Sequence, residues 1–88
     1  MPLELGFRRS SLDSSGLVLQ AENKGNGSLS CRVIATNKTV QQHTDYPFTV
    51  GPYRMAENGI LETGWSFKTG EQEGICVEGF SPVYLTVP

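Results

Sequence analysis

The sequence is poor in the residues on which most catalytic and metal sites depend. It has one histidine and two cysteines, and the cysteines stand far apart, without the paired-ligand spacing that binds zinc. Charged residues make up 18% of the chain and the formal net charge is −2. The basic residues are scattered, which argues against nucleic acid as a partner. No apolar run reaches membrane-spanning length. We therefore expect no metal, no cofactor and no membrane span.

Glycine and proline are frequent by contrast. Ten glycines and five prolines interrupt the 88 residues, and turn residues recurring about every 8–12 positions are typical of an all-β sandwich or barrel. No segment repeats its apolar residues with the period of an α-helix. A chain of this length supports one hydrophobic core, so we predict a single domain over residues 1–88.

Apolar and polar residues alternate in several segments, as they do in strands with one buried face. Leu17, Leu19 and Ala21 share one face of the first clear example. Alternation recurs in residues 29–35, 61–67, 75–77 and 83–87, and a short first strand is expected at residues 3–7. These segments predict an antiparallel β-sandwich of about seven strands.

Residues 61–67 alternate best of all, which predicts a strand with Trp65 in the core. Other segments carry weaker patterns. Residues 38–43 are polar on both faces and suit an edge strand, and residues 48–50 form a short pair bounded by prolines. Residues 52–59 are expected to be a loop, with room for one helical turn, and residues 8–16 a polar loop.

The connection between the strands near residues 17–22 and 29–35 has two solutions. A two-residue turn at Asn26-Gly27 would set polar residues opposite apolar ones on one face, which burial of that face forbids. A three-residue loop over residues 25–27 corrects the register of a hairpin. Alternatively, the chain crosses here between two sheets. Leu17, Leu19, Ala21, Cys31 and Val33 are buried in both solutions.

Alternation also bears on a disulfide between Cys31 and Cys76. Such a bridge would contribute roughly 4 kcal/mol by closing a long loop. Cys31 shares the inward face with Val33, whereas Cys76 lies opposite Ile75 in phase and points outward. A bulge would reverse that face, so the disulfide and two separate thiols both remain open.

Candidates for catalysis are few. His43 has Asp45 two residues on, but no serine lies in a nucleophile elbow, and we interpret His43 as an exposed side chain. Glu71 and Glu73 could act as an acid and a base, although their position predicts a solvated turn. Asn26-Gly27-Ser28 and Asn37-Lys38-Thr39 match the glycosylation acceptor pattern. We expect no enzymatic activity.

Three tyrosines are candidates for a contact surface. Tyr46 and Tyr53 flank the proline-bounded segment, and Tyr84 lies on the face opposite its apolar neighbours. Tyrosine is common where one end of a side chain is buried and the other is wet.

The stretch LVLQAENKGNG, followed by NGILETGWSF, GICVEGF and VYLTV, resembles bacterial immunoglobulin-like accessory modules, including the cell-adhesion-related type. The likeness covers residues 16–88 and implies an immunoglobulin-like sandwich, with a crossing after residue 22. It also implies a non-catalytic module appended to a secreted or surface protein. No functional residue carries over from this resemblance.

The sequence thus predicts a binding or scaffolding module, an accessory domain of a larger extracytoplasmic protein. It would bind a protein or glycan partner through an edge strand, at residues 38–50 or the C-terminal strand, or through a loop surface. The alternative is a stand-alone small inhibitor or a phage-type structural protein.

Overall fold

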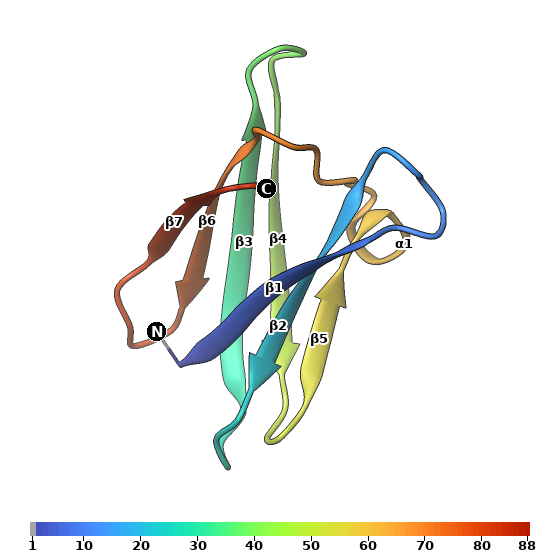
Figure 1. The fold of residues 1–88 in the computed structure, drawn as a ribbon. Helices are drawn as coiled ribbons and strands as arrows, with labels where there is room; N and C mark the ends of the chain where they lie inside the picture. The colour runs from blue at the N-terminus through green and yellow to red at the C-terminus, as the bar shows by residue number, and fades with distance from the viewer. Residues whose placement is uncertain (1) are drawn as a thin grey trace.

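The computed structural model describes residues 2–88 as two antiparallel sheets packed face to face (Figure 1). One sheet has three strands in the order β1-β2-β5, and the other has four in the order β4-β3-β6-β7. The strands are β1 (Leu3–Arg9), β2 (Leu17–Asn23), β3 (Leu29–Asn37), β4 (Gln42–Val50), β5 (Met55–Asn58), β6 (Gln72–Val77) and β7 (Val83–Thr86), with one helical turn, α1 (Ile60–Thr63). The predicted seven-stranded antiparallel sandwich is confirmed.

The chain crosses between the sheets after β2. β2 pairs with β1 and β5, whereas β3 pairs with β4 and β6, so the hairpin solution is wrong. Leu19 and Ala21 reach the core from one sheet, and Cys31 and Val33 from the other. Because β2 and β3 lie in opposite sheets, their apolar side chains face each other across the core. In a hairpin the same side chains would lie side by side on one face.

The core lies between the two layers. Its largest fully buried apolar side chains are Phe67, Leu19, Ile75, Val33, Val50 and Val87. Burial of a side chain of this size is worth about 1.5–3 kcal/mol. Phe7 of β1 meets Phe67 edge to face, with ring centroids 6.4 Å apart, so the segment before β6 contributes to the core without joining either sheet as a strand.

That segment corrects the prediction of a strand over residues 61–67. Residues 60–63 form α1, Leu61 is 77% exposed, and only Phe67 makes an isolated bridge, to Leu17. Gly59 donates its N–H to the Glu62 carboxylate at 2.8 Å, and Gly64 ends the turn at φ 74°. With its N-cap at Gly59 and its C-cap at Gly64, α1 has room for one turn, after which the chain changes direction.

Two other segment boundaries differ from expectation. Residues 38–41 form a tight turn that includes Gln41 at φ 54°. β4 then runs unbroken for nine residues. It replaces the weak strand predicted at residues 38–43 and the short pair predicted at residues 48–50. Residues 55–58, expected in a loop, form β5 because their backbone pairs with β2. Short polar strands of this kind are held by their neighbours, not by their own pattern.

β4 and β7 are the two edges of the four-stranded sheet. Pro47 lies in the middle of β4, opposite Arg32, and lacks the N–H that a further strand would use. β7 has only four residues, between Pro82 and Pro88. Both edges are therefore poor templates for another strand.

The register between β3 and β6 places the two cysteines on opposite faces of the sheet. Cys31 pairs with Val77, and the next position along β3 pairs with Cys76. Neighbouring positions of a strand point to opposite faces, so Cys31 is buried in the core and Cys76 lies on the outer face. Both are free thiols and the disulfide between them is not formed.

Within residues 2–88, no helix is long and apolar enough to span a bilayer.

Candidate binding groove

The groove is built by the segment between α1 and β6, which crosses one end of the sandwich. Thr63 makes the first connection: its hydroxyl accepts the N–H of Trp65 at 2.9 Å and donates to the carbonyl of Gly59 at 2.9 Å. Further along, the carbonyl of Phe67 accepts the N–H of Leu17 at 2.8 Å. The segment is thus tied to Gly59, at the start of α1, at one end and to β2 at the other, so the side chains between these points are held in place.

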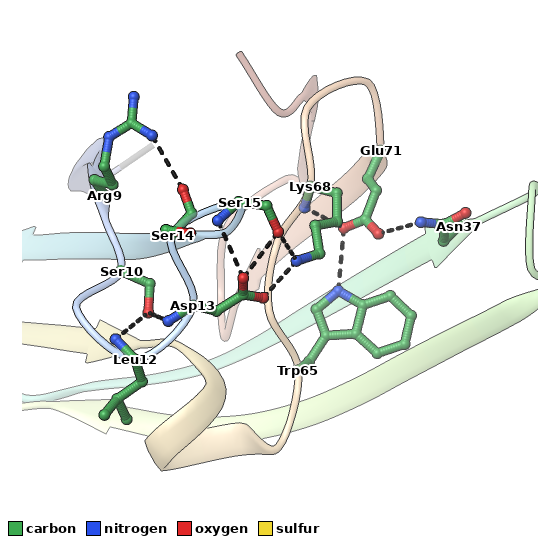
Figure 2. Close-up of polar contacts among 10 residues, drawn as sticks. All are labelled: Arg9, Ser10, Leu12, Asp13, Ser14, Ser15, Asn37, Trp65, Lys68 and Glu71. Atoms are coloured by element: carbon green, nitrogen blue, oxygen red, sulfur yellow. Dashed lines mark hydrogen bonds and ion pairs between the residues drawn. The ribbon is translucent and has the colours of Figure 1, made fainter.

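Glu71 is the organising side chain of this end. It is only 5% exposed and accepts three hydrogen bonds (Figure 2). Its Oε1 receives the indole N–H of Trp65 at 3.1 Å and the backbone N–H of Lys68 at 3.0 Å, and its Oε2 receives the Asn37 amide at 2.6 Å. Hydrogen bonds to a buried carboxylate are among the stronger ones, so Glu71 fixes the positions of its three partners.

Two hollows flank this carboxylate. One is a groove of about 330 Å³, whose walls include Asn37, Val40, Gln42, Ile60, Trp65 and Lys68. The other is a more polar groove of about 450 Å³ between the β3–β4 turn and residues 69–72. Both share Asn37 and Glu71. We call the first hollow, with its indole, its two exposed aliphatic side chains and its amides, the Trp65 groove.

An ion pair holds Lys68 at the rim of the Trp65 groove. Lys68 pairs through Nζ with Asp13 of the β1–β2 loop and donates to the hydroxyl of Ser15 at 2.9 Å (Figure 2). Asp13 also accepts the N–H of Ser15 at 3.1 Å and its hydroxyl at 2.8 Å. The Lys68 ammonium, followed by the Ser15 hydrogen bonds, holds the pKa of Asp13 well below its usual range. Such exposed contacts add little stability, but they orient the lysine.

The prediction that Glu71 and Glu73 lie in a solvated turn is wrong. Both are buried, at 5% and 3% exposure. Glu73 lies on the inner side of β6, between Ala35 of β3 and Leu85 of β7 in register, and neither of its carboxylate oxygens has a hydrogen-bond partner among the described residues. Burial, and then the charge of Glu71, raise the pKa of Glu73 to about 7.

The three tyrosines do not come together. Tyr46 lies on β4 opposite Val33 and packs against the core. Tyr53 lies in the β4–β5 turn at φ 56° and is exposed. Tyr84 is exposed on β7, and its ring covers the backbone of Gly74. β4 and β7 are opposite edges of their sheet, so these side chains cannot form one continuous surface.

The sequence contained local signals for the burial of Glu73 and for α1, but none for the central contact of the groove. Glu73 is in phase with the buried Ile75 and Val77, which should have placed it on the inner face. Gly59 and Gly64 bracket a Glu62 at the position where a capping carboxylate stands. No local pattern indicates that Asn37 meets Glu71, because that contact depends on the pairing of β3 with β6.

No family model, curated protein or solved structure matches the chain. In residues 2–88, no three His, Cys, Asp or Glu side chains gather as a metal site would require. His43 is exposed on β4, and its neighbour in the predicted pair, Asp45, accepts from the Arg32 guanidinium at 2.5 Å. The function is therefore inferred from the geometry of the grooves.

Proposed function

We propose that this chain is a non-catalytic binding module with an immunoglobulin-like sandwich, an accessory domain of a larger extracytoplasmic protein. The strand order supports the immunoglobulin-like part. In that fold, strands A, B and E share one sheet and strands C, F and G the other. β1, β2 and β5 take the first set of places, and β3, β6 and β7 the second.

One observation carries the binding role: Glu71 uses its carboxylate to position the walls of the Trp65 groove. A general acid or base must come within hydrogen-bond reach of its substrate, and Glu71 is only 5% exposed. Each oxygen of Glu71 instead accepts from the protein, and the donors belong to residues that line the groove. A preformed hollow with an aromatic side chain and a few fixed polar groups is the usual form of a ligand site.

The loop surface is favoured over the edge strands as the place of binding. Pro47 interrupts the hydrogen-bonding edge of β4, and prolines bound the four residues of β7. The Trp65 groove, by contrast, offers Val40 at 57% exposure and Ile60 at 37% beside the amides of Asn37 and Gln42. This mixture suits a ligand with both apolar and hydroxyl-bearing faces, and a glycan or a short peptide meets that description.

Amide-resolved NMR titration tests this proposal. The probes are a panel of oligosaccharides and a panel of short peptides, each added to the isotope-labelled domain. We expect shift changes confined to residues 37–42 and 60–71. The exposed Val40→Glu variant should abolish them, whereas Met55→Glu, at a similarly exposed position (52%) on the three-stranded sheet, should not.

Three outcomes would contradict the proposal. Shift changes confined to β1 or β7 would place binding on a sheet edge. Retained affinity in Val40→Glu, with the same fold in its spectrum, would remove the Trp65 groove as the site. Turnover of a probe during the titration would contradict the non-catalytic role.

A further inference from the structure

The chain contains two Asn-Gly pairs, one exposed and one buried. Asn26-Gly27 lies in the β2–β3 connection, and Asn58-Gly59 lies at the end of β5. The connection after β2 is at the end of the sandwich away from α1 (Figure 1). An Asn-Gly pair can react with itself, because glycine leaves its own backbone nitrogen unobstructed by a Cβ.

We propose that Asn26 is a site of covalent self-modification, in which the side-chain amide is lost as ammonia. The backbone nitrogen of Gly27 attacks the side-chain carbonyl carbon of Asn26 and forms a C–N bond. The proton from Gly27 and the amide group leave together as ammonia, which produces a five-membered succinimide. Water then opens the ring at either carbonyl, giving aspartate or isoaspartate, so the only co-reactant is water.

The surroundings of Asn26 permit ring closure. Asn26 and Gly27 are exposed, and no atom lies within 4 Å of the place that a Cβ on Gly27 would occupy. No hydrogen bond within residues 2–88 engages the Asn26 amide or the Gly27 N–H. The loop is anchored instead on either side of Asn26, by the buried Asn23: its amide donates to the Gly27 carbonyl at 2.7 Å and its oxygen accepts the Gly25 N–H at 2.9 Å.

The surroundings of Asn58 prevent the same reaction. Asn58 is 1% exposed and its backbone is paired with Leu19 of β2. The Gly59 nitrogen, which would have to attack, donates its N–H to Glu62 at 2.8 Å. A Cβ on Gly59 would lie 2.7 Å from the Val18 side chain, so the backbone there has no space to rotate. The two Asn-Gly pairs have the same chemical groups, and only their structural surroundings differ.

Modification at Asn26 would alter a defined part of the molecule. Aspartate adds a negative charge two residues from Lys24, which already pairs with Glu4 at 2.6 Å. Isoaspartate adds a methylene to the main chain between the two points that Asn23 holds. The Trp65 groove lies at the other end of the sandwich and should be unaffected.

Peptide mapping by mass spectrometry tests the proposal on the folded domain, produced in a host without N-glycosylation and incubated at mildly alkaline pH. We expect aspartate and isoaspartate to accumulate at position 26, while position 58 stays intact. In guanidinium chloride both positions should react. The Gly27→Ala variant, which fits because its position is open and its φ is not positive, should slow the reaction on the order of tenfold because a Cβ hinders the nitrogen.

Loss of the amide at Asn58 in the folded domain as fast as at Asn26 would overturn the proposal, since burial would then give no protection. An intact Asn26 in the folded domain, under conditions in which the unfolded chain reacts, would overturn it as well. An unchanged rate in Gly27→Ala would show that the loss does not pass through the succinimide.

Discussion

The buried carboxylate of Glu73 should make the stability of the domain depend on pH, and Glu73→Gln should remove that dependence. Glu73 is 3% exposed, and both of its oxygens lack a hydrogen-bond partner among the described residues. An ionised carboxylate in such a place pays a desolvation cost that the protonated form avoids. Glutamine has nearly the same shape and no charge, so the variant isolates the cost of ionisation.

The magnitude follows from the shift in pKa. Burial, and then the charge of Glu71, raise the pKa of Glu73 from its ordinary value of 4.5 to about 7. Between these values the folded state keeps a proton that the unfolded chain has released, so the free energy of unfolding falls as pH rises. At about 1.4 kcal/mol for each unit the upper bound is roughly 3 kcal/mol, and the part of this change that falls between pH 5 and pH 8 is about 2 kcal/mol.

Urea unfolding at a series of pH values from 5 to 8 measures this cost. The native protein should lose about 2 kcal/mol across the range, and Glu73→Gln should be nearly flat and more stable than the native protein at pH 8. His43→Gln is the control, because it removes the one histidine of the chain and leaves Glu73 in place. Equal slopes for Glu73→Gln and the native protein, or a native stability that rises with pH, would refute the reasoning.

Three further outcomes are expected. Glu71→Gln should lower the free energy of unfolding by about 2 kcal/mol in the same urea assay, because an amide cannot accept all three buried donors; an unchanged value would contradict the role given to Glu71. Iodoacetamide should alkylate Cys76 in the folded protein and spare Cys31, whose pKa is raised by burial; mass spectrometry identifies the labelled peptide, and equal labelling would contradict the register of β3 and β6. Hydrogen bonding to Arg8 lowers the pKa of Glu57 to about 2, so this pair stabilises the fold above pH 4.5 and is lost as pH falls through 2. Glu57→Gln should therefore flatten the acid limb of the unfolding profile, and an identical limb would exclude the pair as a contributor.

Alternation predicted the strands whose one face is buried. Residues 17–23 and 29–37 follow it closely, and even the crossing between them was one of two solutions that the apolar pattern allowed. The same rule failed at residues 61–67, where Leu61, Thr63, Trp65 and Phe67 alternate without forming a strand. Alternation reports only which residues are apolar, and Gly59 and Gly64, on either side of four residues, were the stronger signal there.

The groove was harder to predict than the fold. Its central contact joins Asn37 to Glu71, which come together only because β3 pairs with β6. Glutamates in a glycine-rich stretch are usually solvated, and that expectation concealed the buried carboxylates. Glu73 could have been placed from its phase with Ile75 and Val77, whereas the partners of Glu71 depend on tertiary structure and have no local pattern.

The order of strands in the two sheets has a consequence for how the chain folds. β1 with β2, β3 with β4, and β6 with β7 are neighbours in sequence and can form early as separate hairpins. β5 must then reach back past β3 and β4 to join β2, and β6 must return to β3. The loss of chain entropy on closing such long loops comes before any contact compensates for it, and this slows folding. Sandwiches of this connectivity fold on a timescale of milliseconds to seconds. We therefore expect the docking of the hairpins, and not their formation, to limit the rate at which the domain appears.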